Sequence, residues 1–314
     1  MMEHAPSARF RHVEIAKYQT GHAQQVAELE SAVLPVSPGT LDYQLALPSR
    51  FALTEVGQDN GRVVGFLDTR AEESDLFSLR ISVAPDARQQ GLGGYLFERA
   101  MRFARECHPR PKVRGRLNDA DVSSLEWARR RGFEEFAHRT GMARDLQEDA
   151  DELEKAAAET RQRIGVDVVS WPSSPMAGDW DSLVGLVTRC ISGTKDSAAS
   201  GGLSAGFVRF LTPNPPGVLI LSRDGAPVGL ASISCERDRT WNTWFTGIVP
   251  ESRGMGLARA LKLTTMALAR RQGGRRITGF NDVKNAPILH LNESLGFERC
   301  HGFRLVENAP TSGI

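Results

Sequence analysis

The sequence predicts an α+β fold made of two tandem domains, each a mixed and mainly antiparallel sheet flanked by helices. Three observations predict it: a stretch that recurs at a fixed offset, the same succession of strands and helices in each half, and the length of the chain. The 314 residues suit about two domains, because a domain usually holds roughly 100–200 residues.

The repeat is the most specific of these observations. Residues 83–93 read VAPDARQQGLG and residues 248–258 read IVPESRGMGLA, an offset of 165. A second landmark, Gly-Phe, stands at 132–133 and again at 296–297, an offset of 164. Two landmarks at nearly one offset indicate a duplicated domain with a single-residue insertion or deletion between the copies.

The repeat also sets the expected boundaries. We expect an N-terminal domain at 9–145, a helical linker at 146–164 and a C-terminal domain at 165–314. The linker reads LQEDADELEKAAAETRQRI and has few large apolar residues, which is typical of a solvated helix. The alternative is one more surface helix of a single domain.

Periodicity predicts the elements of the first half. Alternating apolar residues favour strands, Asp59-Asn60-Gly61 favours a hairpin turn, and apolar residues at helical spacing favour a long helix after the repeated turn. In chain order we expect strand Phe10–Ala16, helix Ala23–Val33, strands Phe51–Val56, Arg62–Thr69 and Leu76–Val83, helix Leu92–Cys107, strand Lys112–Leu117, helix Ser123–Arg131 and strand Phe133–Met142.

The second half repeats this order. We expect strand Val166–Ser170, helix Trp180–Cys190, strands Val218–Ser222, Val228–Cys235 and Thr243–Val249, helix Leu257–Arg271, strand Arg276–Phe280, helix Ala286–Leu295 and strand Phe297–Phe303.

Composition narrows the function classes. Lys+Arg is 39 and Asp+Glu is 38, and this balance argues against a dedicated nucleic-acid or polybasic membrane surface. The four cysteines are far apart in sequence, which favours reduced thiols and no metal. No leader-like apolar region opens the sequence and no apolar run nears the ~20 residues that span a bilayer, so we expect a cytoplasmic protein.

The repeated turn carries the chemistry. A strand ends at Val-Ala-Pro or Val-Pro, a helix begins within a few residues, and Arg-x-x-Gly-x-Gly/Ala lies between them. Small residues let a ligand approach the backbone, and a helix N-terminus offers unpaired N–H groups to a diphosphate. The spacing fits neither a dinucleotide-binding G-x-G-x-x-G on a first strand nor a Walker A loop.

At these residues the sequence resembles the GCN5-related N-acetyltransferase (GNAT) superfamily. The resemblance covers about 10–145 and 165–308, so each half is expected to be a GNAT-like domain. It is most specific at SVAPDARQQGLGGYLFERA in the first half and at TGIVPESRGMGLARALKL with NDVKNAPILHLNESLGF in the second. The later helix of the first half, DVSSLEWARRRGF, is less typical. In architecture alone the tandem form resembles mycothiol synthase.

The resemblance implies acetyl-CoA, or another acyl-CoA, as the donor. Backbone N–H groups of the turns would hold its pyrophosphate, and the fourth strand of each half would receive the pantetheine arm and offer an N–H to the oxyanion. The implied cofactor-binding residues are Thr246, Ile248, Arg253, Gly254, Met255, Gly256, Leu257 and Ala258 in the second half, and Val83, Arg88, Gln89, Gln90, Gly91 and Gly93 in the first.

The superfamily commonly has an Asn early on the last helix, which contacts the cofactor, and a Tyr seven residues later, which protonates the departing thiolate. By position these are Asn285 and Asn292 in the second half, and Asp121 and Ala128 in the first. Neither half has the tyrosine. Asn285 is a cofactor residue, a helix cap or both, and Asn292 either hydrogen-bonds the sulfur, positions a water or is a surface residue.

The base that deprotonates the acceptor ammonium is less well defined. Glu236 and Asp238 are candidates, or they belong to a solvated turn. Trp241 and Trp244 either line an acceptor pocket or pack in the core. The segment Ser192–Gly206, which has no counterpart of its length in the first half, is a substrate lid or a flexible segment.

The expected activity is therefore transfer of an acetyl group from acetyl-CoA to a primary amine of a small molecule by direct attack, with the chemistry in the second half. The alternatives are a non-catalytic acyl-CoA-binding protein and an acetyltransferase acting on a protein lysine or N-terminus. We expect a monomer or homodimer and no nucleic-acid or membrane partner.

Overall fold

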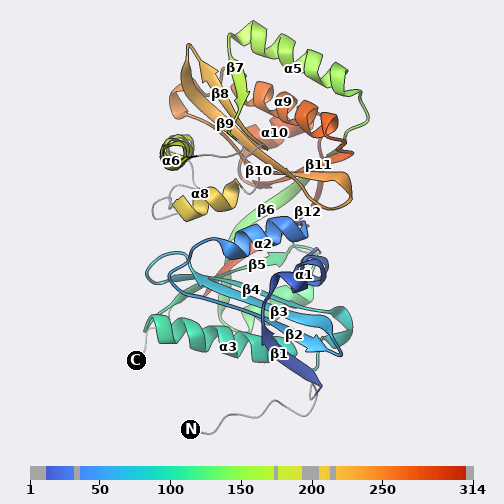
Figure 1. Cartoon of the computed structure of the whole chain (residues 1–314), viewed down its shortest axis with the longest axis vertical. Coiled ribbons are helices and arrows are strands. Elements are labelled where there is room, and N and C mark those ends of the chain that lie inside the picture. Colours follow the sequence, from blue (N-terminus) through green and yellow to red (C-terminus); the bar gives the residue numbers. More distant parts are fainter. Residues whose placement is uncertain (1–11, 32–35, 173–175, 193–204, 213–216, 309–314) are drawn as a thin grey trace. The chain divides into compact units, whose positions relative to one another are not determined.

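A computed structural model describes residues 12–31, 36–172, 176–192, 205–212 and 217–308. Its internal contacts divide the chain into two compact units. The first unit comprises Met1–Asp42, Pro48–Thr140 and His301–Ile314, and the second comprises Tyr43–Leu47 and Gly141–Cys300. Each is a mixed sheet with helices, which confirms the predicted fold class (Figure 1).

The first unit has the expected order of elements. They are β1 (Val13–Lys17), α1 (Ala23–Glu30), β2 (Ala52–Asp59), β3 (Arg62–Ala71), β4 (Leu76–Val83), α3 (Leu92–Cys107), β5 (Lys112–Asn118), α4 (Val122–Arg129) and the start of β6 (Phe133–Asp145). The strand order is β1-β2-β3-β4-β5-β12. The first four strands pair antiparallel and β4 pairs parallel with β5, because α3 connects them as a crossover.

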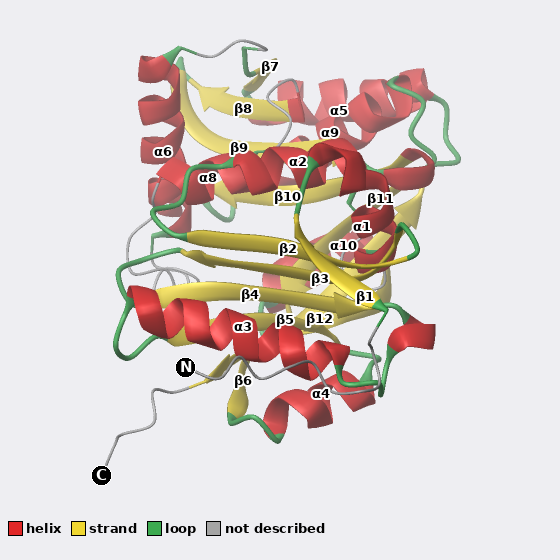
Figure 2. Ribbon diagram, turned by 60° about the horizontal axis from the view of Figure 1, so that its bottom comes forward, coloured by secondary structure: helices red, strands yellow, loops and turns green. Residues whose placement is uncertain are grey.

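The core of this unit lies between the sheet and α3, which runs alongside β4 in Figure 2. Leu92, Leu96 and Ala100 recur every four residues on α3, so they share one face, and they pack against Phe77 of β4. The opposite face of the sheet carries α1, which packs on β3 and β4. The fourth strand therefore lies between α3 on one face of the sheet and α1 on the other.

The second unit repeats the arrangement. Its elements are the end of β6, α5 (Ala150–Ile164), β7 (Asp167–Ser170), α6 (Ala177–Ile191), α8 (Ala205–Leu211), β8 (Val218–Arg223), β9 (Ala226–Cys235), β10 (Thr240–Ile248), α9 (Leu257–Arg271), β11 (Arg276–Asp282), α10 (Ala286–Ser294) and the start of β12 (Glu298–Asn308). The strand order is β6-β11-β10-β9-β8-β7. Helix α9 covers one face of β8–β10, and α6 covers the other.

The end of the last strand of each sequence repeat lies in the other repeat's unit. Phe303–Asn308 of β12 pair antiparallel with Asn118–Val113 of β5, inside the first unit. Conversely Gly141–Asp145 of β6 belong to the second unit, where Met142 is fully buried beside Trp241. Strands of 13 and 11 residues are about twice the usual length, so each is long enough to leave one unit and enter the other.

The contact division therefore differs from the expected boundaries at 145, 165 and 314. The expected linker forms a helix, α5, but this helix is not simply solvated. Leu153 and Ala157 are buried against Met266 of α9, so α5 is part of the second unit's core. Its apolar residues are few, yet they fall on one face, and that is enough to anchor a helix.

Two short helices lie outside the expected set, α2 (Pro38–Ala46) and α8. Most of the segment Ser192–Gly206, the lid hypothesis, lies outside the described residues. Among the helices that the structure describes, none combines the length and the apolar character of a bilayer-spanning segment.

Candidate functional site

The repeated turn of the second unit leaves a row of backbone N–H groups without acceptors. Gly254 and Gly256 have φ of 79° and 80°, and Gly256 is the N-cap of α9 with no side chain capping it. In the described part of the chain, the amides of 254–258 donate no hydrogen bond. A Cβ at either glycine would meet no atom within 4 Å, so the space above these amides is open.

The first unit has the same turn with a similar backbone, although Gln89 stands where the second turn has Gly254. Gln89 and Gly91 take positive φ values of 59° and 98°, and Gly91 is the uncapped N-cap of α3. The amides of 89–93 likewise find no acceptor among the described residues. Each turn thus presents unpaired N–H groups at a helix N-terminus, an arrangement that suits an anion, and we call these two turns the cradles.

The arginine of each motif, Arg88 or Arg253, stabilises its turn through hydrogen bonds. The Nε–H groups of Arg88 and Arg253 donate to the carbonyls of Val83 and Ile248, each at 3.1 Å. Their backbone amides already donate to Pro85 and Pro250, so the open amides begin one residue later than expected. Arg253 also donates to the carbonyl of Cys190 at 2.8 Å.

In each unit, the strand before the turn separates from its parallel neighbour. The pairing of β10 with β11 ends at Thr243 and Gly279, although β10 continues to Ile248. The pairing of β4 with β5 ends in the same way at Leu79 and Gly115. We call these two places the forks. Thr246 and Ile248, which the sequence marks for the pantetheine arm, lie on β10 beyond its fork and pair with β9 on their other side.

Only the second of these fourth strands is bulged. The register of β10 against β9 shifts between Thr243 and Phe245, so Trp244 is an extra residue at the fork. The register of β4 against β3 is continuous from Phe77 to Val83. A bulge leaves a residue out of the ladder and redirects it, so the second fork has a feature that the first lacks.

A chain of hydrogen bonds holds the bulged residue. The indole Nε1–H of Trp244 donates to the hydroxyl of Ser234 at 2.6 Å, and Ser234 in turn donates to the carboxylate of Glu236. Glu236 is buried and Asp238 is exposed. Ser234 was not among the residues predicted from the sequence, because it pairs with Asn242 on the neighbouring strand and reaches Trp244 only through its side chain. Trp241 is buried in the core.

The two asparagines of the second unit differ in their surroundings. The side chain of Asn285 caps α10 and accepts from the amide of Ile288 at 3.4 Å. Asn292 is 1% exposed, and its Oδ1 is buried without a hydrogen-bond partner among the described residues. A buried acceptor left unpaired costs about 1–3 kcal/mol, so Asn292 is unfavourable for folding alone.

The equivalent positions of the first unit have other uses. Asp121 caps α4, accepts from Ser123 and Ser124, and lies 3.6 Å from Arg88 of the turn. Burial tends to raise the pKa of Asp121, but these hydroxyls and Arg88 outweigh it and lower that pKa. The carboxylate therefore stays ionised beside the first turn. Ala128 is buried in the core.

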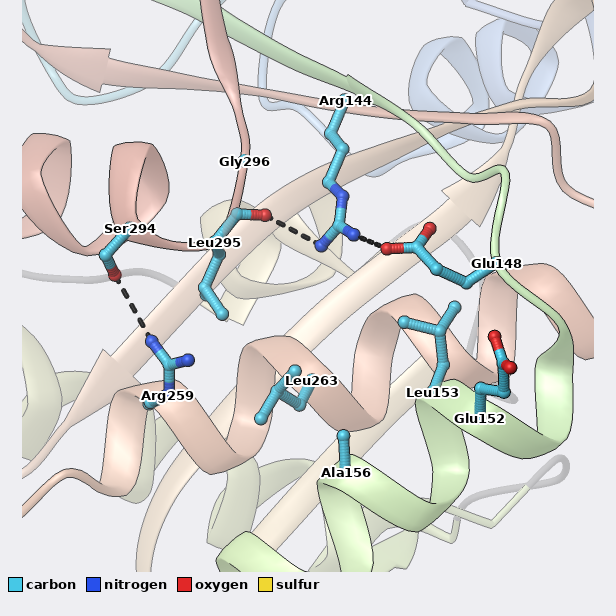
Figure 3. Close-up of a pocket in the computed structure, with 10 residues that line it drawn as sticks. All are labelled: Arg144, Glu148, Glu152, Leu153, Ala156, Arg259, Leu263, Ser294, Leu295 and Gly296. Carbon is cyan, nitrogen blue, oxygen red and sulfur yellow. Dashed lines mark hydrogen bonds and ion pairs between the residues drawn. The ribbon is translucent and has the colours of Figure 1, made fainter.

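A shallow pocket of about 310 Å³ lies elsewhere in the second unit, between α5, α9 and the end of α10 (Figure 3). Arg144 donates to the carbonyl of Leu295 at 2.7 Å and pairs with Glu148, and Arg259 donates to Ser294 at 3.2 Å. Its residues are Arg144, Glu148, Glu152, Leu153, Ala156, Arg259, Leu263, Ser294, Leu295 and Gly296. Two carboxylates make it unsuited to a polyanion, and no turn residue lines it.

Comparisons with known proteins identify the family to which the chain belongs. Residues 51–135 match the family model described as an acetyltransferase (GNAT) domain, and residues 194–297 match the model of the acetyltransferase (GNAT) family. The chain belongs to the GNAT acetyltransferase superfamily, as a tandem form with one domain in each half.

One curated relative and one solved structure are similar to this chain over most of its length. The mycothiol acetyltransferase of Acidothermus cellulolyticus is 25% identical over 77% of this chain and 75% of its own length. That of Thermomonospora curvata is 33% identical, but over only 27% of this chain and 29% of its own length. A tandem GNAT protein from the clavulanic acid biosynthesis pathway has the same fold, with a TM-score of 0.70, 18% identity, and coverage of 96% of this chain and 100% of that one.

Proposed function

We propose that this protein transfers an acetyl group from acetyl-CoA to a primary amine of a small molecule, and that the second unit performs the reaction. The observation that carries the proposal is the bulge at Trp244, which lies on the same strand that ends in the open cradle at 254–258. The first unit has a cradle and a fork but no bulge in β4.

The cradle fits a pyrophosphate. It offers a row of free N–H groups, positive φ at Gly254 and Gly256, and open space where a side chain would otherwise stand. The N-terminal end of α9 adds a favourable dipole for negative charge. Bound there, acyl-CoA supplies an activated thioester, and the strand edge at Thr246–Ile248 guides it toward the fork.

In this proposal Trp244, the bulged residue just beyond the last β10–β11 pair, lies beside the reacting carbonyl. Because the bulge takes its backbone N–H out of the regular ladder, this N–H is available to stabilise the oxyanion of the tetrahedral intermediate. Ser234 and Glu236 hold the indole and so fix the direction of that group. We assign Glu236 as a positioning residue, since its carboxylate is buried and already accepts from Ser234.

Asn292 stands where the superfamily commonly has its tyrosine. We propose that its side chain contacts the departing sulfur. A thiolate with a pKa of about 8.5 leaves readily near neutral pH, so a hydrogen-bond donor is sufficient and a strong acid is not required. The donor in that contact would be Nδ2. The buried Oδ1, which has no partner among the described residues, supports a functional use, since packing alone gives no reason to keep an amide there.

The acceptor is proposed from the relatives. Similarity to mycothiol acetyltransferases favours a small molecule, although the identity is 25% over the longer alignment. A panel of small primary amines, assayed for release of free coenzyme A with purified full-length chain, tests the activity. Turnover on at least one amine is expected. Binding of acetyl-CoA without turnover on any amine, or turnover only on peptides, would instead support the non-catalytic or the protein-directed alternative.

A further inference from the structure

The two forks differ in chemical character. In the first unit the residues just beyond the last paired positions are Arg80 on β4 and Arg116 on β5. In the second unit the residues at the same places are Trp244 and Phe280. Both replacements follow the repeat offset of 164. The fork that is aromatic in one unit is thus doubly cationic in the other.

Both arginines lie on the face of the sheet opposite α3. Phe77 and Leu79 of β4 and Val113 of β5 point to α3, where they belong to the core. Side chains alternate along a strand, so Arg80 and Arg116 point to the other face. The contacts agree, because Arg80 pairs with Glu30 of α1 on that face, and Glu30 also accepts from Ser82 at 2.9 Å.

Arg116 carries charge that the described residues do not neutralise. Its guanidinium stacks 4.5 Å from the ring centroid of Phe303, but within the described part of the chain it forms no ion pair or hydrogen bond. Burial, and then the charge of Arg80, lower the pKa of Arg116 to about 10 against the opposing effect of Glu30 and Glu72. Arg116 is half-buried, and a guanidinium that is partly withdrawn from water without an ion-pair partner is unfavourable for folding.

A carboxylate is the group that suits this arrangement. Guanidinium groups bind carboxylates with charge-assisted hydrogen bonds, often two at once. Arg80 is already committed to Glu30, which leaves Arg116 as the open donor and Arg80 as a second positive charge near it. Glu72 faces the same region and partly offsets these charges, so the pair Arg116 and Arg80 favours an additional negative charge beside Arg116.

We propose that the fork of the first unit binds a carboxylate beside Arg116, in a site distinct from the acetyl-transfer site of the second unit. The carboxylate belongs either to the acyl group of a dicarboxylic acyl-CoA or to a free carboxylic acid. The first source rests on the cofactor binding proposed above, because the first unit's cradle would hold the coenzyme. The second source does not depend on it.

Calorimetric titration of the full chain tests the proposal, in a Gly256→Glu background that blocks the second cradle. The probes are acetyl-CoA, succinyl-CoA and succinate alone. We expect succinyl-CoA to bind at least about tenfold more tightly than acetyl-CoA, or succinate alone to bind. Arg116→Gln should remove the preference or the binding. Arg114→Gln is the matched control, since Arg114 lies two residues away and is already paired with Glu307.

Preference for succinyl-CoA assigns the carboxylate to the acyl group, and binding of succinate alone assigns it to a free acid. Equal affinity for the two thioesters together with no binding of succinate would overturn the proposal, and so would a preference that Arg116→Gln leaves unchanged. Arg116→Phe, which copies Phe280, is the second variant if Gln impairs folding. Failure of the unaltered chain to bind acetyl-CoA would count against the proposed acetyltransferase function. The titration with succinate alone would still decide whether a carboxylate binds beside Arg116.

Discussion

The indole Nε1 of Trp244 lies 2.6 Å from the hydroxyl oxygen of Ser234, which in turn donates to the buried carboxylate of Glu236. This chain joins the bulged residue of β10 to the end of β9. The orientation of the Trp244 side chain therefore depends on the Ser234 hydroxyl, to which we assign no direct role in the reaction.

Ser234→Ala should therefore lower kcat by about tenfold, or ~1.4 kcal/mol of transition-state stabilisation, with little change in KM for acetyl-CoA. Removing the hydroxyl frees the indole and leaves the Glu236 carboxylate short of one donor. Steady-state kinetics with both substrates varied measure the two constants. Cys235→Ala, an exposed neighbour on the same strand, is the control. An unchanged kcat in Ser234→Ala would remove the positioning role.

Asn292→Leu should separate stability from activity. The variant removes a buried oxygen that has no partner, so we expect the free energy of unfolding to stay the same or to rise by about 1 kcal/mol. We expect kcat to fall at least about tenfold, because the donor to the departing sulfur is lost. Thermal melting and coenzyme A release measure the two effects. Full activity in Asn292→Leu would show that this side chain has no catalytic use.

A substitution at the end of β12 should destabilise the first unit, although β12 comes from the second sequence repeat. Val306 lies in the second repeat, but it is 2% exposed in the core of the first unit. Val306→Asp should place an unpaired charge there and destabilise the first unit by several kcal/mol. Hydrogen exchange should then accelerate in β4 and β5 and remain slow in β8 and β9. The opposite pattern would place the strand in the second unit.

Lys262 gives a pH-dependent prediction. Burial lowers its pKa to about 8, and its ammonium lies 5.3 Å from the ring centroid of Phe297. Between about pH 8 and 10.5 the unfolded chain therefore binds more protons than the folded chain. The cost to folding of burying the charged Lys262 is fully present below pH 8 and disappears above pH 10.5. Lys262→Met should stabilise the protein at pH 7 by up to about 3 kcal/mol.

Denaturant unfolding of the original chain and of Lys262→Met, measured from pH 7 to 10.5, checks this prediction. The stability difference should shrink steadily across that range. A difference that is constant with pH would mean that Lys262 is solvated, or that its charge is compensated, in the folded protein.

Periodicity and turn chemistry were enough to predict most elements and both cradles. The helix at Leu257–Arg271 was predicted to the residue, because its apolar face and the glycines before it are local signals. The capping role of Asn285 was also among the sequence alternatives, since a polar side chain before Ala-Pro is a local feature too.

Features that depend on pairing between distant segments could not be predicted in this way. The exchange of β6 and β12 leaves no mark on periodicity, since a strand has the same alternation whichever neighbour it joins. The hydrogen bonds from Trp244 to Ser234 and from Ser234 to Glu236 depend on the pairing of β9 with β10, which places Ser234 opposite Asn242. The fork that Arg80 and Arg116 form could not be predicted either. These residues are 36 positions apart in sequence and come together because β4 and β5 pair in parallel up to Leu79 and Gly115.

The central claim, that the second unit performs the transfer, is tested most directly by one paired substitution. Gly256→Glu and Gly91→Glu put the same charged side chain at the equivalent N-cap glycine of each cradle, both at positive φ, so the backbone strain is matched. Turnover is measured as coenzyme A release with an accepted amine. We predict that Gly256→Glu abolishes turnover and that Gly91→Glu retains most of it. Loss of turnover in Gly91→Glu with activity preserved in Gly256→Glu would instead place the reaction in the first unit.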